Sequence, residues 1–459
     1  MSREGGPWSG RRLHFVGIGG AGMSGYALAS YELGATVTGS DRAMSGYGER
    51  LRERTGIEPV IGHSAENVPS GDAVEVVYSS AISSENCERA TARARGLREL
   101  PRAELLRELS GLRRTIAVAG AHGKTTTSSM VAHILASCGL DPSFLIGGVL
   151  RSAGTNAAWG TGDWLVVEAD ESDRSMLELQ VEIAVVTNVE LDHHATFSSM
   201  HEVEDVFRVF LRGAPRAVLW NRERLLALRE GPFVAYDVRE QDAELGRLGS
   251  RFQWADLEVH LPIPGLHNAR NAAGALEAAH AAGVDPRAAV EALASFAGVG
   301  RRFERLGITD SGAVMYDDYA HHPTEVRATI DAARTVAVEN ELDVDGRLLP
   351  RGRLIVVFQP HLFSRTAALA RDFAAALAEA DEVVVLDVYP ARERAEDWPG
   401  ISGQTIVDAV RKVAKGGVFW SPTQADAEKT LRALLKEGDL CIVMGAGDID
   451  ALGRRLVGR

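Results

Sequence analysis

Short apolar segments alternate with helical stretches along this chain, and the alternation restarts twice. The three runs read LHFVG, TVTGS and VEVVYS, then RTIAVAG, WLVVEA and IAVVTN, then AVMYDD, RLIVVFQP, EVVVLDVYP and DLCIVMGAG. Strands that alternate with helices are typical of mainly parallel α/β sheets, and 459 residues are too many for one ordinary core. We therefore predict three α/β domains, at residues 1–109, 110–298 and 299–459.

The composition limits the partners and the compartment. A net charge of −13 argues against nucleic acid or an anionic membrane as the main partner. The three cysteines are scattered, which favours a reducing cytosol over a disulfide framework or a zinc site. No apolar run approaches the roughly 18 residues that span a bilayer, and the first residues lack the apolar core of a signal peptide. A cytoplasmic protein is predicted.

The first glycine-rich loop follows the segment LHFV. Gly17, Gly19 and Gly22 match the dinucleotide fingerprint G-x-G-x-x-G, and Asp41 stands about where an acid that binds a ribose would stand. Taken alone, this loop favours a nicotinamide-dependent dehydrogenase.

A second, different glycine loop runs from Gly120 to Thr125 and ends in Gly-Lys-Thr. Backbone N–H groups of such a loop cradle phosphate, Lys124 would neutralise it, and the hydroxyl of Thr125 suits Mg²⁺. The match to the Walker pattern is partial, because Val118 holds the place of its first glycine. A chance Gly-Lys-Thr on a surface turn is the alternative, and the preceding strand and the hydroxyl-rich helix start argue against it.

Carboxylates follow the next two strands. Glu168 ends WLVVE, and Asp192 and His193 follow IAVVTNVEL. Mg²⁺ uses one or two carboxylates together with nucleotide phosphates, so Thr125 and Glu168 would be enough to hold it. An imidazole is an unusual ligand for so hard an ion, and His193 taken alone is more typical of a helix cap or a packing residue.

Eight motifs in a fixed order extend these observations: GAHGKTTT, EADESD, TNVELDHH, HNARNA, GVGRRFE, DDYAHHPTE, FQPHLFSRT and GAGDI. With GIGGAGMSG before them, they resemble the Mur ligases of peptidoglycan synthesis over nearly the whole chain. The resemblance implies an N-terminal Rossmann-like UDP-binding domain, a central P-loop ATPase-like domain and a C-terminal Rossmann-like domain that binds an amino acid. It also implies ATP and Mg²⁺ as cofactors. The implied substrates are UDP-N-acetylmuramate and L-alanine.

The same resemblance implies roles for individual residues. In the family the first glycine loop is similar to a site for the UDP diphosphate, so it no longer requires a nicotinamide. Catalysis is implied for Lys124, Glu168, His193 and Arg302, and metal binding for Thr125, Glu168 and His193. ATP binding is implied for Gly120, His122, Gly123, Lys124, Thr125, Thr126, Asn268, Asn271, Arg302 and Asp318. Binding of the other substrates is implied for Gly19, Gly20, Gly22, Met23, Ser24, Asp41, His63, Ser79, Ser172, Asp173, His321, His361 and Arg365.

Three alternatives stay open at this point. A dehydrogenase would leave the Gly-Lys-Thr loop, Glu168 and Arg302 without a role. A recycling ligase would join a peptide to the same sugar nucleotide, but such enzymes tend to read E-Y-D where this chain has Glu171-Ser172-Asp173. A non-catalytic relative would not need its phosphate-handling residues. Glu171 itself could orient a neighbour or cap a turn, and His322, which precedes a proline, is expected to be structural.

One motif departs from the family. The common pattern is F-Q-P-H-R-Y-x-R, whereas this chain has Leu362 for the first arginine and Phe363 for the tyrosine. The resemblance then leaves Arg365 alone to pair with the carboxylate of the amino acid. With one anchor fewer, we expect only modest discrimination between L-alanine and glycine.

Overall fold

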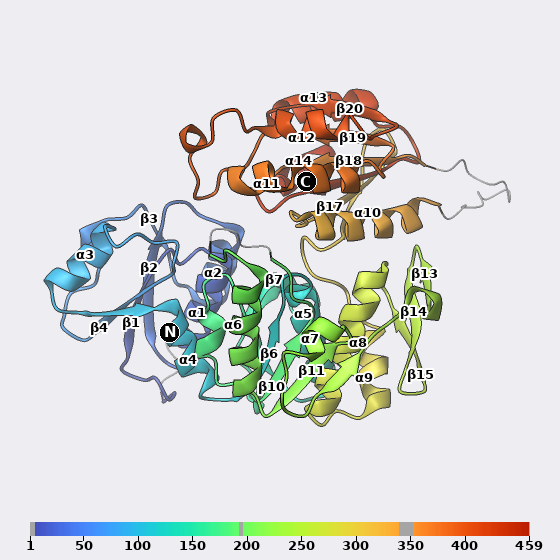
Figure 1. Ribbon diagram of the computed structural model, residues 1–459. Coiled ribbons are helices and arrows are strands. Elements are labelled where there is room, and N and C mark those ends of the chain that lie inside the picture. Colours follow the sequence, from blue (N-terminus) through green and yellow to red (C-terminus); the bar gives the residue numbers. More distant parts are fainter. Residues whose placement is uncertain (1–4, 192–195, 339–351, 459) are drawn as a thin grey trace. The chain divides into compact units, whose positions relative to one another are not determined.

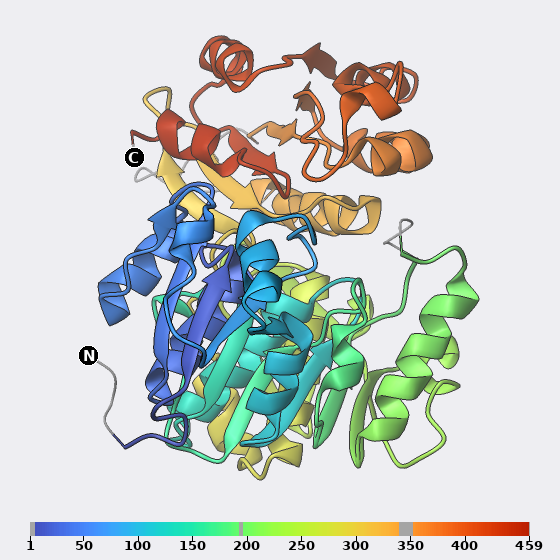
Figure 2. The ribbon, with the colours of Figure 1, turned by 90° about the vertical axis from the view of Figure 1, so that its left-hand side faces the viewer.

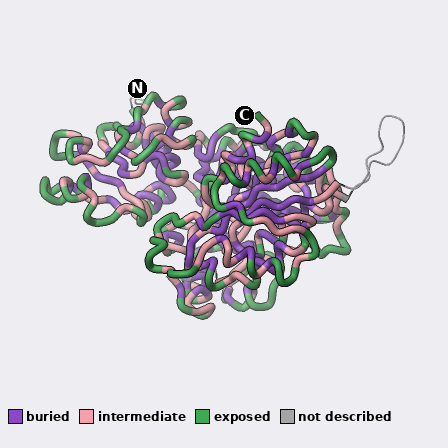
Figure 3. The backbone as a smooth tube through the Cα atoms, turned by 90° about the horizontal axis from the view of Figure 1, so that it is seen from above, coloured by how far each residue is buried: buried purple, intermediate pink, exposed green. Residues whose placement is uncertain are grey.

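The computed structural model describes residues 5–191, 196–338 and 352–458. The chain forms two compact units, one of residues 1–237 with 271–297 and the other of residues 238–270 with 298–459. Buried stretches, in purple, run through the interior, and exposed stretches, in green, lie toward the outside (Figure 3). Within the described residues, none of the helices combines the length and the apolar composition that a bilayer crossing needs.

The first unit begins with a parallel sheet in the strand order β3-β2-β1-β4-β5. This order and direction are those of a Rossmann-like sheet. Its strands are β1 Arg12–Val16, β2 Thr36–Asp41, β3 Val60–Ile61, β4 Val74–Tyr78 and β5 Arg98–Pro101. Its helices are α1 Ala21–Glu32, α2 Gly46–Thr55, α3 Cys87–Ala94 and α4 Arg102–Ser110, with the short 3-10 helix η1 Ala65–Asn67.

A seven-stranded sheet in the order β12-β11-β10-β6-β9-β7-β8 completes this unit, and only its β7–β8 pair is antiparallel. Its strands are β6 Arg114–Ala119, β7 Ser143–Leu150, β8 Thr155–Ala158, β9 Trp164–Glu168, β10 Ile183–Val186, β11 Arg216–Trp220 and β12 Val234–Tyr236. Its helices are α5 Lys124–Ser137, η2 Ser175–Glu178, α6 Met200–Gly213, α7 Glu223–Leu226 and α9 Pro286–Leu293. Figure 2 shows this sheet, in cyan to green, beside the blue N-terminal sheet.

The central strands β6, β9 and β10 are almost wholly buried, because helices cover both faces of the sheet. Helix α1 of the first sheet packs on β7 and β8 of the second: the amide of Asn156 donates to the backbone oxygen of Ala21 at 2.7 Å. One apolar cluster contains side chains of both sheets. The two sheets therefore pack against one another through α1, β7 and β8.

The second unit contains a six-stranded sheet in the order β16-β17-β21-β18-β19-β20, in which only the edge strand β16 is antiparallel. Its strands are β16 Glu304–Ile308, β17 Val314–Asp318, β18 Leu354–Phe358, β19 Glu382–Val385, β20 Gly417–Trp420 and β21 Leu440–Met444. Its helices are α10 Pro323–Val338, α11 Phe363–Leu377, α12 Gly403–Val410, α13 Gln424–Leu434 and α14 Asp450–Leu456, with η4 Ala395–Asp397 (Figure 1).

A small antiparallel sheet in residues 238–270 was not predicted. It consists of β13 Ala243–Gly246, β14 Gly249–Trp254 and β15 Leu257–Leu261, preceded by η3 Glu240–Asp242. Helix α8, Leu266–Ala281, follows it and is the alanine-rich helix that the sequence predicts. The α/β class and the named apolar strands of all three runs are confirmed. The division at residues 109 and 298 stays a prediction.

Candidate active site

The Gly-Lys-Thr loop, residues 120–125, connects β6 to α5 and is called the phosphate loop below. Nearby atoms leave no space for a side chain at either of its glycines. Gly120 has a φ of 134°, and a Cβ there would lie 2.2 Å from the hydroxyl of Thr187. Gly123 has a φ of 82°, and its Cβ would lie 2.5 Å from the side-chain oxygen of Asn271. No side chain of the described residues caps the start of α5, so the N–H groups of its first turn are available to an anion. Asn271 therefore lies against the phosphate loop.

The ammonium group of Lys124 lies inside this loop. Its Nζ donates to the backbone oxygen of Gly120 at 2.6 Å and to the two carboxylate oxygens of Glu171 at 3.0 and 3.2 Å. Burial by itself lowers the pKa of Lys124, but the charges of Glu171 and Asp170 outweigh it and raise the pKa to about 12. Lys124 is thus a permanent cation, and the role of Glu171, left open by the sequence, includes pairing with it.

A hydroxyl and a carboxylate meet beside the lysine, as a site for Mg²⁺ requires. The Thr125 hydroxyl lies 3.2 Å from Oε2 of Glu168, and the N–H of Gly147 donates to Oε1 of Glu168 at 2.5 Å. Oxygen donors of this kind at a phosphate loop fit the ion. The other predicted ligand, His193, and its neighbour Asp192 lie outside the described residues.

The remaining residues of the phosphate loop have structural partners. The N–H of His122 donates to Asn188 at 3.0 Å, and its ring lies 3.3 Å from a carboxylate oxygen of Glu190. Thr187 donates to the backbone oxygen of His122 at 2.5 Å. Thr126 is buried in the first turn of α5. Asn188 and Thr187 follow β10, so two neighbouring strand ends hold the loop in shape.

The first glycine loop connects β1 to α1 and is held by two side chains of the β2–α2 connection. Asp41 accepts from the N–H of Gly19 at 2.8 Å, and the hydroxyl of Ser45 donates to the backbone oxygen of Gly19 at 2.5 Å. Helix α1 begins after Gly20 without a side-chain cap among the described residues. Asp41 therefore shapes the loop in this structure, and the uncapped first turn of α1 is suited to an anion.

Met23 and Ser24, also predicted from the sequence, are buried in the first turns of α1. The Ser24 hydroxyl donates to the backbone oxygen of Ala21 at 3.1 Å. These two residues thus support the loop from within the helix.

A cavity of about 150 Å³ brings both glycine loops together. Three sequence-predicted residues, Gly22, Lys124 and Glu168, line it. The other lining residues are Ala21, Gly25, Tyr26, Arg102, Leu145, Ile146, Gly147, Asn156, Asp170 and Ser175. The sequence analysis missed Arg102, Tyr26, Asn156 and Asp170. Arg102 directly follows strand β5, and Asp170 comes two residues after the end of β9, so the rule that ligand residues follow strands could have found them.

The loop after β9 forms one wall of this cavity. Asp173 accepts from Nε and Nη2 of Arg102 at 3.0 and 2.5 Å, and the N–H of Ser172 donates to Asp170 at 2.9 Å. Burial raises the pKa of Asp170, but Lys124 and the hydrogen bonds from Ser172 outweigh it and hold the pKa below its usual value. The wall is therefore anionic on the side of the loop and cationic at Lys124 and Arg102.

His63 and Ser79 do not line this cavity. His63 Nδ1 lies 3.0 Å from the hydroxyl of Ser40 and 3.3 Å from the buried carboxylate of Glu88. Ser79 follows β4, at the same sheet edge as the glycine loop. The structure thus leaves their predicted place near the uridine untested.

Six predicted residues lie in the second unit: Asn268, Arg302, Asp318, His321, His361 and Arg365. Asp318, at the end of β17, accepts from the N–H groups of Phe303 and Ala320 at 2.7 and 2.8 Å. Nη1 of Arg302 lies 3.9 Å from Glu325, and its guanidinium lies over the ring of Tyr319.

The histidine rings of His321 and His361 meet edge to face with 5.6 Å between their centroids, and His361 stacks on Tyr389. Arg365 is buried in the first turn of α11. The side-chain amide of Asn268 donates to the backbone oxygen of Pro264 at 2.7 Å. His322, expected to be structural, is buried.

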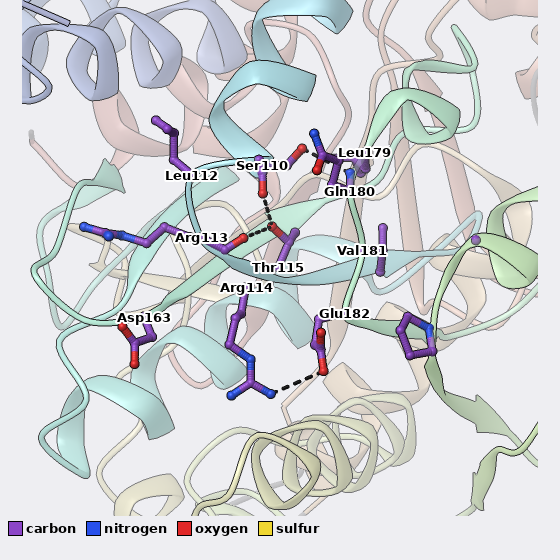
Figure 4. Close-up of a pocket in the computed structure, with 13 residues that line it drawn as sticks. Ser110, Leu112, Arg113, Arg114, Thr115, Asp163, Leu179, Gln180, Val181 and Glu182 are labelled. Carbon is purple, nitrogen blue, oxygen red and sulfur yellow. Dashed lines mark hydrogen bonds and ion pairs between the residues drawn. The ribbon is translucent and has the colours of Figure 1, made fainter. Parts of the chain in front are cut away.

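A second depression, of about 740 Å³, lies at the amino ends of the strands of the central sheet (Figure 4). Arg114 there points toward Glu182, with Nη2 3.3 Å from the carboxylate, and the Thr115 hydroxyl donates to the backbone oxygen of Ser110. None of the sequence-predicted residues lines this depression. Ligands of open α/β sheets bind at the carboxyl ends of strands, so the smaller cavity is the candidate active site.

The fold and this cavity define an α/β protein with two glycine loops, each followed by a helix start that is suited to a phosphate group. Three family models then match the chain: "Mur ligase family, catalytic domain" at residues 12–114, "Mur ligase middle domain" at 118–279 and "Mur ligase, glutamate ligase domain" at 301–447. The chain belongs to the Mur ligase family, as its eight motifs predict.

Named relatives and solved structures agree with this assignment. The UDP-N-acetylmuramate–L-alanine ligase of Thermobifida fusca is 43% identical, over 97% of this chain and 96% of the relative. The crystal structure of UDP-N-acetylmuramate-alanine ligase from Thermotoga maritima superposes with a TM-score of 0.82 at 29% identity, covering 97% of this chain and 98% of that one. A murein peptide ligase from Psychrobacter arcticus superposes with a TM-score of 0.72 at 26% identity, covering 97% and 98%.

Proposed function

We propose that this chain is the ATP-dependent ligase that joins L-alanine to the lactoyl carboxylate of UDP-N-acetylmuramate, in the synthesis of peptidoglycan precursors. The observation that carries the proposal is the cavity that both glycine loops line. It places Gly22, at the loop proposed for the UDP diphosphate, in the same space as Lys124 and Glu168 of the phosphate loop. A ligase that activates one end of a sugar nucleotide with ATP needs this proximity.

The first step forms an acyl phosphate. A lactoyl carboxylate oxygen attacks the γ-phosphorus of ATP, and the bond from that phosphorus to the oxygen of ADP breaks. Lys124 neutralises the charge on the transferred phosphoryl group, and the first-turn N–H groups of α5 bind the other phosphates of ATP. Thr125 and Glu168, with His193, would hold a Mg²⁺ ion that neutralises phosphate charge. Gly120, His122, Gly123, Thr126 and Asn271 shape the loop around the nucleotide.

The second step forms the amide. The amino group of L-alanine attacks the acyl carbon, and inorganic phosphate leaves. We assign His321, His361 and Arg365 to the amino acid, and Asn268, Arg302 and Asp318 to ATP. These groups belong to the second compact unit, apart from the phosphate loop in the first.

The substrate side of the proposal covers the first glycine loop, with Gly19, Gly20, Gly22, Met23, Ser24 and Asp41, and the segments with His63, Ser79, Ser172 and Asp173. We place the reaction in the cytoplasm, which the scattered cysteines support. Neither a nucleic acid nor a membrane is proposed as a partner. Glycine is proposed as a second, slower amino acid substrate.

The test is ligation with purified protein, ATP, Mg²⁺ and UDP-N-acetylmuramate, offered each amino acid or a muropeptide in turn. We expect ADP release and a product mass that corresponds to the L-alanine adduct. Lys124→Met and Glu168→Gln should lower the rate by about a hundredfold or more, because each removes charge stabilisation at the transferred phosphoryl group. His193→Ala should raise the Mg²⁺ concentration needed for half-maximal rate.

ATP hydrolysis at full rate without an amino acid would refute the proposal. A product formed only with the peptide would replace it with the recycling activity.

A further inference from the structure

We propose that Arg102 is a substrate-binding residue that contacts an anionic group of the sugar nucleotide with one edge of its guanidinium and holds the loop after β9 with the other. This inference deepens the proposed function and rests on it. None of the eight motifs includes Arg102.

One edge of the Arg102 guanidinium, formed by Nε and Nη2, binds the loop after β9. Its Nε and Nη2 donate to one oxygen of Asp173 at 3.0 and 2.5 Å, and Nη2 lies 3.5 Å from Asp170. Both aspartates belong to the loop that connects β9 to η2, between Glu168 and Ser175. Arg102 thus ties helix α4 of the N-terminal sheet to the loop that also carries Glu171, the partner of Lys124.

The other edge of the guanidinium, at Nη1, faces the first glycine loop. A Cβ built on Gly22 would lie 3.6 Å from Nη1 of Arg102, and both residues line the cavity. Nη1 makes no hydrogen bond to any of the residues that the structure describes. A side chain at position 22 would occupy the space between the guanidinium and the first turn of α1. Because Gly22 has no side chain, this space has room for a small anionic group.

The chemistry of the surroundings favours an oxygen anion at this point. The uncapped first turn of α1 supplies N–H groups, and Nη1 supplies a charge-assisted donor from the opposite side. Tyr26, which also lines the cavity, stays neutral because burial raises its pKa to about 12. The anion is either a diphosphate oxygen or the lactoyl carboxylate, and the helix start beside Gly22 favours the diphosphate.

The experiment measures binding by calorimetry without ATP, so that no ligation takes place. UDP-N-acetylmuramate and UDP-N-acetylglucosamine serve as the two ligands, because the second has the diphosphate and lacks the lactoyl carboxylate. Arg102→Met should weaken the binding of both by about 10- to 100-fold, the usual effect of losing a hydrogen bond to a charged group. Loss confined to UDP-N-acetylmuramate would support the proposal with the carboxylate as the contact.

Two sets of variants separate contact from architecture. Asp173→Asn combined with Arg102→Met removes both charges of the pair, so the loop is not left with an uncompensated carboxylate. Arg107→Met is the matched control, since Arg107 lies on the same helix, 3.8 Å from Glu178 of η2, and is 61% exposed. We expect Arg107→Met to bind both ligands as the wild type does, and the double variant to bind as weakly as Arg102→Met.

Two results would overturn the inference: unchanged affinity in Arg102→Met, or affinity restored in the double variant, because Arg102 would then act only through Asp173. Failure of the wild-type protein to bind UDP-N-acetylmuramate would instead contradict the proposed function.

Discussion

Lys124 Nζ and Oε2 of Glu171 lie 3.0 Å apart, and this ion pair joins the phosphate loop to the loop after β9. Lys124 cannot direct all its donors at a phosphate while it is paired in this way. A nucleotide that binds the loop must therefore share the ammonium with Glu171 or displace it.

Replacing Glu171 by glutamine should strengthen nucleotide binding. The substitution removes a buried carboxylate that competes with phosphate for Lys124. A hydrogen bond to a charged group is worth roughly 1.5–3 kcal/mol, so we expect the affinity to rise by about tenfold or more. The measurement is the Kd of a non-hydrolysable ATP analogue. Glu178→Gln, at the more exposed end of η2, is the matched control and should leave the Kd unchanged. Weaker binding in Glu171→Gln would mean that the carboxylate orients Lys124 rather than competing for it.

Gly123→Ala should destabilise the first unit more than Gly139→Ala. Both glycines have a positive φ, 82° and 78°, so both substitutions incur backbone strain. Only at position 123 would the new Cβ meet another atom, 2.5 Å from Asn271, whereas at position 139 nothing lies within 4 Å. Overpacking at position 123 should lower the free energy of unfolding by a further amount of about 1–3 kcal/mol. Denaturant unfolding of the two variants measures the difference, and equal stabilities would contradict the close approach of Asn271.

Glu88 should make stability depend on pH in the acid range. Burial raises its pKa, but hydrogen bonds from His14, Asn67 and Ser40 outweigh it and lower the pKa from 4.5 to about 2. The folded state binds the proton more weakly than the unfolded state. The stabilisation, about 3 kcal/mol, is therefore complete above pH 4.5 and is lost as the pH falls toward 2.

Glu88→Gln tests this dependence. The difference in unfolding free energy between wild type and Glu88→Gln should be largest near neutral pH and should shrink from pH 4.5 downward. Glu85→Gln, an exposed position before the same helix, should show no such dependence. A difference that stays constant with pH would show that Glu88 has the same pKa in the folded and unfolded protein.

Arg365→Ala should raise the KM for L-alanine by orders of magnitude. Arg365 is 4% exposed, and Leu362 stands where the family pattern has a second arginine. Loss of a buried partner of a carboxylate costs roughly 2–5 kcal/mol. Arg371→Ala, an exposed position on the same helix, is the control. An unchanged KM would remove Arg365 from the amino acid site.

Glycine should be a measurable substrate of the wild-type protein, because one methyl group is worth only about 1–3 kcal/mol of discrimination. The comparison is kcat/KM for L-alanine and for glycine under identical conditions. Rejection of glycine beyond about a thousandfold would contradict the modest selectivity expected from Leu362.

Local patterns were enough to predict the strands that begin at Arg114, Trp164 and Leu354, because each is a short apolar run that ends in polar residues. The small sheet of β13–β15 escaped prediction because its strands are short and rich in polar residues, and they lack the continuous apolar runs of the buried parallel strands. Gly-Lys-Thr predicted the turn between β6 and α5, because this turn needs a positive φ at Gly120 and Gly123, which glycine adopts without strain. The spacing of Asp41 from the first glycine loop matches that of a ribose-binding acid, but in this structure its carboxylate accepts from the N–H of Gly19. Spacing along the chain could not distinguish these two roles.

The sequence by itself determined the α/β class, the two glycine loops and the family, because each depends on residues that are close together along the chain. Only the tertiary structure decided that Arg102 meets Asp173, that Asn271 lies against Gly123, and that Gly22 shares a cavity with Glu168. These partners are separated by 71 to 148 residues, counting from their numbers in the chain. Arg102 and Gly22 follow strands of the first sheet, Glu168 and Asp173 lie at and after the end of β9 in the second sheet, and Asn271 lies in helix α8. Only the packing of these elements brings the residues together, because no local pattern pairs them.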